Sequence, residues 1–287
     1  MNGIMKRALW AIFSLAILFP PALPAAPTAP QGETLTLGVF PYISANQMME
    51  QLSPLCKRIE ESLGKKVILV SAPDFMSYVD RTAKGEYDLV LTGPHMGYLA
   101  EKRDGWQRVV QSGQKTATML LVRQESSVQR LEDLRGKKIT VGNRRSLTYL
   151  LAEKALAEKG IILGKDVEVI ETATFSNVVQ SVFLGEADVG ATPTLLWDKW
   201  ENVNPEQQRQ LREIYRSKPA APSFLVMASP KTDQKTVRRL TDSLLSFQDS
   251  VEGKTFFQKS QLMSFEPLDD ASMESAAPFV HVLMQPQ

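Results

Sequence analysis

The stretches Leu35-Thr-Leu-Gly-Val-Phe-Pro-Tyr42 and Asp88-Leu-Val-Leu-Thr-Gly-Pro-His-Met-Gly-Tyr98 decide the fold of this chain. Each is a short apolar strand that ends in a turn containing Gly or Pro. The first strand leaves Tyr42 at its carboxyl tip, and the second is followed by a helix that carries Tyr98. In open α/β sheets, ligands bind beyond the carboxyl ends of the strands. The two tips therefore predict a binding site that both stretches share.

Strand and helix patterns alternate along the rest of the chain. The first half predicts strands at 34–40, 66–71 and 87–91, with helices at 46–63 and 74–84. The second half predicts strands at 138–141, 167–170 and 187–191, with helices at 146–159 and 177–184. This βαβαβ order, repeated once, predicts an α/β protein with parallel strands and right-handed crossovers.

The two halves also share a turn sequence. Gly85-Glu-Tyr-Asp88 and Gly185-Glu-Ala-Asp188 each follow a predicted helix and precede a predicted strand. Glycine at such a position allows the left-handed conformation that closes a helix. We expect both aspartates to be structural.

The N-terminal residues are typical of an export signal. Lys6 and Arg7 precede an apolar run over 8–19, which is too short for a membrane span. We expect a signal peptide over 1–26, cleaved near Ala25 or Ala26, and a leader over 27–33. The alternative is an uncleaved anchor. Export predicts a periplasmic location.

Composition excludes several other classes of protein. The net charge of +1 gives no sign of a nucleic-acid surface, and the single Cys56 cannot form an intrachain disulfide. Cys56 lies in a helical apolar pattern, where we expect it to be buried. There is no P-loop, dinucleotide fingerprint, Gly-x-Ser-x-Gly elbow or metal-ligand spacing. We therefore expect no cofactor, no metal and no enzymatic activity.

Five segments carry a resemblance to a known family: 38–42, 85–90, 93–98, 131–138 and 184–189. With them, the chain resembles the periplasmic solute-binding proteins of phosphonate, phosphite and phosphate ABC transporters. The resemblance implies a type II periplasmic binding protein, which is a monomer of two βαβ lobes with mixed or parallel sheets. Expected chain crossings near 119–125 and 217–226 would form the hinge. Lobe 1 would comprise 34–122 and 223–287, and lobe 2 would comprise 123–222.

The resemblance also implies which residues reach the ligand. Tyr42 and Tyr98 occupy the positions of the family's ligand-contacting tyrosines. Ser146 and Thr148, with backbone N–H groups at the start of a helix, would hold an oxyanion. The other polar candidates at strand tips or helix starts are Thr92, His95, Thr174, Ser176 and Thr192.

The phosphate-holding turn departs from the family pattern. Arg145 stands where a small residue is expected, and Leu147 replaces a hydroxyl. Arg145 could clamp an oxyanion or a carboxylate, or Arg144 and Arg145 could both be solvated. His95 could contact the oxyanion or respond to pH, and packing at the helix start is the alternative.

The family's acidic and histidine positions for a ligand amine are also unmatched, so an aminoalkylphosphonate is disfavoured. Phosphate, phosphite, sulfate or a small carboxylate remains open. The expected partners are a small anionic ligand and an inner-membrane ABC permease. A ligand sensor that signals to a membrane kinase is the alternative, and a secreted enzyme on the same scaffold is a third option.

Overall fold

Two sheets with the same strand plan make up the computed structural model, which describes residues 34–198, 205–260 and 262–284. The predicted signal peptide and leader lie outside these residues. The first sheet has the order β11-β4-β10-β3-β1-β2, and the second has the order β7-β6-β8-β5-β9. In each sheet three neighbouring strands are parallel and the next ones are antiparallel. The predicted α/β class with parallel βαβ units is confirmed.

The strands of the first sheet are β1 (Leu35–Val39), β2 (Val67–Ser71), β3 (Leu89–Thr92), β4 (Gln107–Ser112), β10 (Leu225–Ala228) and β11 (Phe265–Glu266). Those of the second sheet are β5 (Thr118–Arg123), β6 (Lys138–Val141), β7 (Glu168–Glu171), β8 (Val189–Pro193) and β9 (Leu211–Arg216). The buried side chains of the first sheet belong to one large apolar cluster, and those of the second sheet belong to a second large cluster and a small one around Met119, Leu121 and Leu211. Each sheet therefore has its own core.

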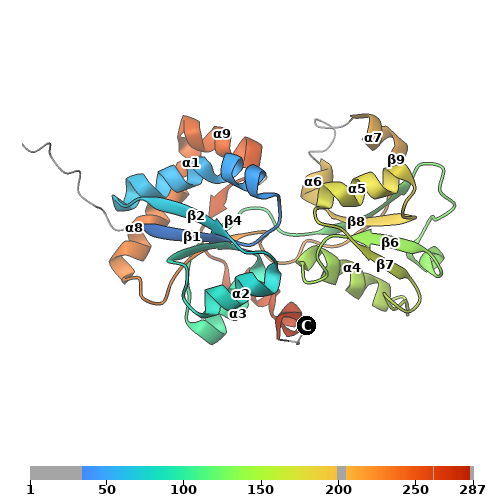
Figure 1. The fold of residues 1–287 in the computed structure, drawn as a ribbon, viewed down its shortest axis with the longest axis horizontal. Helices are drawn as coiled ribbons and strands as arrows, with labels where there is room; N and C mark the ends of the chain where they lie inside the picture. The colour runs from blue at the N-terminus through green and yellow to red at the C-terminus, as the bar shows by residue number, and fades with distance from the viewer. Residues whose placement is uncertain (1–33, 199–204, 261, 285–287) are drawn as a thin grey trace, which may run out of the picture. The chain divides into compact units, whose positions relative to one another are not determined.

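Helices cover both faces of each sheet (Figure 1). Around the first sheet lie α1 (Ala45–Leu63), α2 (Phe75–Ala83), α3 (Pro94–Asp104), α8 (Gln234–Leu245), α9 (Val251–Ser260) and α10 (Asp270–Glu274). Around the second lie α4 (Leu147–Ala157), α5 (Phe175–Leu184), α6 (Thr194–Asp198) and α7 (Pro205–Gln210). Short 3₁₀ helices are η1 (Leu131–Leu134), η3 (Phe247–Asp249) and η4 (Ala277–Leu283).

Side-chain caps decide where several helices begin. Asp74 caps α2 by accepting a hydrogen bond of 2.8 Å from the N–H of Ser77. Thr174 caps α5 by accepting from the N–H of Asn177 at 3.2 Å. The helix therefore begins at Phe175, two residues before the predicted start.

Asp88 and Asp188 perform the same structural task in the two sheets, as predicted. The Asp88 carboxylate accepts a hydrogen bond of 2.7 Å from the N–H of Thr36, at the start of β1. The Asp188 carboxylate accepts a hydrogen bond of 2.8 Å from the N–H of Lys138, at the start of β6. Each carboxylate thus holds the neighbouring parallel strand in register.

The chain passes between the two sheets through segments 113–117 and 217–224. Strand β5 (Thr118–Arg123), which we expected to end the first lobe, lies instead in the second sheet between β8 and β9. Its apolar residues pair antiparallel with both neighbours. The two connecting segments bond to each other, with Thr116 donating to Ala221 at 2.9 Å and Ser223 donating to Gln114 at 2.8 Å.

The C-terminal segment, which we assigned to lobe 1, packs on both cores. Met273, Val280 and Leu283 are buried in the apolar cluster of the first sheet. Ala276 and Phe279 are buried in that of the second. This segment is therefore a third connection between the two halves.

Other surface features complete the description. Cys56 is half-buried against the first core, and burial raises the pKa of its thiol to about 11.

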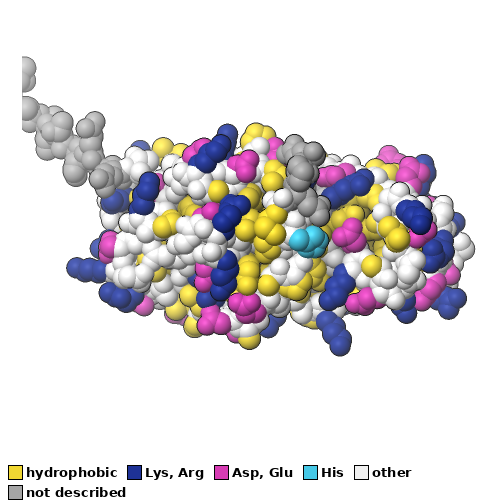
Figure 2. Space-filling view, turned by 90° about the horizontal axis from the view of Figure 1, so that it is seen from below, with side chains coloured by type: hydrophobic (Ala, Val, Ile, Leu, Met, Phe, Trp, Pro, Cys, Tyr) yellow, Lys and Arg dark blue, Asp and Glu magenta, His cyan; other side chains and the backbone are white. Residues whose placement is uncertain are grey.

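None of the helices in the described ranges combines the length and the hydropathy that a membrane crossing needs. On the face in Figure 2, cationic and anionic side chains are interspersed around apolar ones.

Candidate ligand-binding site

A cavity of about 140 Å³ lies where the parallel strands of both sheets end. Residues just after β1 and β3 of the first sheet and after β6, β7 and β8 of the second line this cavity. The two connecting segments complete its wall with Gln114, Lys115, Thr116 and Ser223. The strand-tip position that the sequence predicted for a binding site is thus where the structure has its cavity.

Several helices begin at this cavity. Helices α2, α3, α4 and α5 each contribute residues of their first turn or their N-cap to the lining. The first turn of a helix carries N–H groups without intrahelical partners and the positive end of the helix dipole. The convergence of four such ends favours a negatively charged ligand.

Tyr42 forms an aromatic wall of the cavity. Its ring stacks on Phe40 with a centroid distance of 4.9 Å and lies 5.2 Å from the ring of Phe224. Burial raises the pKa of the Tyr42 phenol well above its ordinary value, so the group stays protonated. Its hydroxyl is buried and has no hydrogen-bond partner in the structure. A buried unpaired donor is costly, so this hydroxyl is a candidate contact for a bound ligand.

His95 lies at the start of α3 and is only 1% exposed. Its Nε2 is 2.8 Å from the backbone carbonyl oxygen of Arg145. A carbonyl only accepts, so Nε2 carries the proton and donates. Burial, the main effect, lowers the pKa of His95 to about 4, so the ring is neutral at physiological pH. Its Nδ1 is buried without a partner.

Six of the ten predicted ligand contacts line this cavity. They are Tyr42, His95, Ser146, Thr148, Thr174 and Ser176. Two of them also cap helices. Ser146 accepts a hydrogen bond of 3.2 Å from the N–H of Tyr149, and Thr174 is the N-cap of α5. The cap holds each hydroxyl at a helix start, next to the free N–H groups of the first turn.

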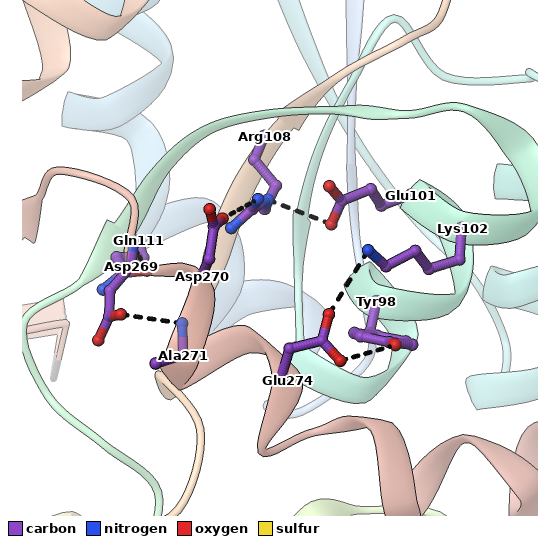
Figure 3. A network of polar contacts seen from close by, with 9 residues as sticks. All are labelled: Tyr98, Glu101, Lys102, Arg108, Gln111, Asp269, Asp270, Ala271 and Glu274. Atoms are coloured by element: carbon purple, nitrogen blue, oxygen red, sulfur yellow. Dashed lines mark hydrogen bonds and ion pairs between the residues drawn. The ribbon is translucent and has the colours of Figure 1, made fainter.

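Tyr98 does not line the cavity, contrary to the expectation. It lies one turn further along α3 than His95, and its hydroxyl donates to Glu274 at 3.0 Å (Figure 3). Lys102 pairs with the same carboxylate at 3.5 Å. A helix turns by about 100° per residue. Three residues after His95, the side chain of Tyr98 is rotated by about 60° around the helix axis from that of His95, and it reaches Glu274 in the C-terminal segment.

The arginine turn also differs from the expectation, because neither guanidinium lines the cavity. Arg144 pairs with Glu171 at 3.5 Å and donates to the Val169 carbonyl at 3.2 Å. Arg145 contributes its backbone, whose carbonyl accepts from His95. The positive charge of Arg145 also helps to lower the pKa of Asp74, after the larger effect of the Ser77 hydrogen bonds.

Thr92 and Thr192 are the other two expected contacts that the cavity lining lacks. Both are almost fully buried in the strands behind it. The Thr92 hydroxyl is 3.5 Å from the carbonyl of Gly93, and the Thr192 hydroxyl has no hydrogen-bond partner. Strand alternation directs these side chains into the sheet packing.

The cavity lining includes further residues that the sequence analysis did not name. Gln47 and Gln51 come from α1, and Phe75, Phe175 and Phe224 add aromatic walls. Among the described lining residues, Lys115 alone is charged, and none is acidic. A helix-start pattern could have revealed Phe75 and Phe175, because each follows a capping residue.

A comparison with protein-family models gives a match over residues 37–273, to the periplasmic substrate-binding proteins of phosphonate ABC transporters. The chain belongs to this family. Its members are substrate-binding transport proteins of the periplasm, which agrees with the predicted export. The resemblance noted from the sequence is confirmed.

Solved structures with the same fold include PhnD1 from Prochlorococcus marinus in complex with methylphosphonate. It has a TM-score of 0.78 and 16% identity, and the match covers 88% of this chain and 98% of that one. XAC2383 from Xanthomonas citri, bound to ATP, has a TM-score of 0.73 and 22% identity, with the same coverage. A component of an ABC phosphonate transporter from Pseudomonas aeruginosa has a TM-score of 0.74 and 17% identity, with coverage of 88% and 95%.

Proposed function

We propose that this protein captures a small oxyanion in the cavity beside Tyr42 and His95 and delivers it to an inner-membrane ABC permease. The observation that best supports this proposal concerns two residues that line the cavity where four helices begin. The Tyr42 hydroxyl and His95 Nδ1 are buried there without hydrogen-bond partners. The lining supports an anion with a small apolar substituent, such as an alkylphosphonate. The named structural relatives of phosphonate transporters support the same class.

The proposal includes two lobes that close on the ligand. One lobe would be built on the first sheet and the other on the second, with 113–117 and 217–224 as the hinge. These segments are bonded to each other and line the cavity, so ligand contacts and hinge geometry are coupled. Hinged lobes that close around a ligand are a known switching architecture.

Calorimetric titration of the mature protein with methylphosphonate, phosphate, phosphite, sulfate and small carboxylates tests the proposal. We expect one ligand per monomer, and about 2.7 kcal/mol of added stability at one hundred times the Kd. Small-angle scattering should show a smaller radius of gyration upon binding. Absence of binding across the panel would contradict an oxyanion carrier.

A matched pair of variants locates the site. Ser176→Ala removes a hydroxyl that lines the cavity, whereas Ser275→Ala removes one that donates to the Ser272 carbonyl away from it. Only the first should weaken binding. Recovery of the bound ligand unchanged after prolonged incubation would distinguish binding from enzymatic turnover.

The role in transport has its own test. Ligand uptake by cells should require both this protein and the permease. If binding persists but uptake is independent of the protein, a sensor that signals to a membrane kinase becomes the better reading. Protein released by osmotic shock, with its N-terminus read by mass spectrometry, would establish cleavage near Ala26 against an uncleaved anchor.

A further inference from the structure

The hydrogen bond of His95 determines which nitrogen of its ring is left as a free acceptor. Nε2 donates to the Arg145 carbonyl oxygen at 2.8 Å, so the neutral ring has its lone pair on Nδ1. Nδ1 is buried and unpartnered, on a side chain that lines the cavity and is 1% exposed. A lone pair in this position requires a hydrogen-bond donor.

The surroundings keep the ring in this state across the neutral range. Tyr42 and Lys115 are the other titratable side chains that line the cavity, and Asp74 and Arg145 lie on the elements packed near the start of α3. The Tyr42 phenol stays protonated, and hydrogen bonds from Ser77 keep Asp74 ionised by lowering its pKa. Lys115 and Arg145 supply positive charge. Between pH 6 and 8.5, Tyr42, Asp74 and His95 thus keep one protonation state.

The charges in the cavity favour a ligand with a single negative charge. Lys115 is the one charged residue among the described lining residues, and it is exposed. The helix ends supply partial positive charge only. A second negative charge on a buried ligand would therefore have little compensation, and burying an uncompensated charge is costly.

We propose that His95 Nδ1 accepts a hydrogen bond from a hydroxyl of the ligand, so that the site selects a singly protonated phosphoryl anion over a sulfonyl anion of the same shape. This inference rests on the proposed function. The Tyr42 hydroxyl is a donor and suits an ionised ligand oxygen. The two unpaired atoms thus match the P–O⁻ and the P–OH of one monoanion.

The chemistry of the two anion classes explains the selection. The second ionisation of a phosphoryl group lies near neutral pH, at about 6 for a phosphate ester. A sulfonate has already lost its only proton, so it would place an anionic oxygen against the Nδ1 lone pair. Repulsion between this oxygen and the Nδ1 lone pair disfavours the sulfonate more strongly than the mere loss of one hydrogen bond would.

Two variants separate the nitrogens of the ring. His95→Gln places an amide near Nε2, so it can keep the bond to the Arg145 carbonyl and lose the acceptor. His95→Asn places its amide near Nδ1, so it can keep the acceptor and lose the bond. Thermal unfolding without ligand shows whether each variant is folded.

The experiment is titration of wild type and both variants with methylphosphonate and methanesulfonate from pH 6 to 8.5. Wild type should bind methylphosphonate at least tenfold more tightly than methanesulfonate at pH 6. This advantage should decrease by about tenfold per pH unit above the second ionisation of the ligand. His95→Gln should lose the preference and the pH dependence, and His95→Asn should retain the preference.

Each remaining outcome contradicts a distinct claim. Equal binding of the two probes by wild type would overturn this inference and leave the oxyanion carrier standing. The same holds if His95→Gln retains the preference and its pH dependence. If neither these probes nor the wider anion panel binds, the proposed function itself fails.

Discussion

Successive turns of α3 differ in how their polar side chains are satisfied. At the first turn, His95 lines the cavity and its buried Nδ1 has no hydrogen-bond partner, and the same is true of the hydroxyl of Tyr42. One turn later Tyr98, and two turns later Lys102, contact the carboxylate of Glu274 on α10 (Figure 3).

This contrast separates ligand binding from fold maintenance. A buried polar atom without a partner costs roughly 1–3 kcal/mol, so a fold keeps one where something else completes it. The Tyr98 hydroxyl needs no ligand, because Glu274 on α10 already accepts its hydrogen bond. Two tyrosines that look alike in the sequence thus have different tasks.

The largest expected effect comes from exchanging the two tyrosines for alanine. Tyr42→Ala removes a hydroxyl donor and an aromatic wall, and we expect ligand affinity to decrease by about 30-fold or more, roughly 2 kcal/mol. Tyr98→Ala should change affinity by less than about twofold, since its side chain lies outside the cavity. Calorimetric titration of both variants with the same ligand measures the difference. Equal losses in the two variants would mean that Tyr98 enters the closed site.

Acid stability provides the second test. The unfolded chain protonates His95 near its ordinary pKa of 6.5, whereas the folded protein does so only near 4. The unfolded state therefore binds the proton first, and stability is complete above pH 6.5 and decreases as the pH falls toward 4. By pH 5 this amounts to about 2 kcal/mol.

Chemical denaturation at pH 8 and pH 5 measures that loss. His95→Gln should lose less stability between the two pH values than wild type does, by the amount due to His95. The matched control is His281→Gln, because His281 is exposed and its Nδ1 donates to the Pro278 carbonyl at 2.8 Å. An unchanged acid sensitivity in His95→Gln would contradict a buried neutral imidazole.

The smallest effect is expected at the C-terminal contact of α3. Glu274→Ala removes the partner of Tyr98 and Lys102, both of which lie near solvent. Exposed pairs contribute little, so we expect Tm to decrease by about 2 °C or less and ligand affinity to stay the same. The Glu274 hydrogen bond raises the pKa of Tyr98, so the variant should also shift the ultraviolet titration of that phenol toward lower pH. A large loss of ligand affinity would show that this contact acts on the cavity through α3.

Local patterns predicted much of the fold. The paired turns ending in Asp88 and Asp188 led us to expect equivalent structural carboxylates, and both bind the first residues of a neighbouring strand. Ser146 and Thr174 were visible as residues at helix starts because capping is a local property of the chain. The prediction failed at β5, since its place depends on pairing with β8 and β9, strands that are distant in the sequence.

The sequence by itself determined the two βαβ units, the family and the strand tips beside which the cavity lies. Periodicity, caps and turns are encoded within a few residues, which is why these features could be read directly. Only the tertiary structure decided that His95 bonds to the Arg145 carbonyl, that Tyr98 turns away to Glu274 and that both arginines leave the cavity. Those outcomes depend on helix rotation and on contacts between residues far apart in the chain, which local chemistry does not specify.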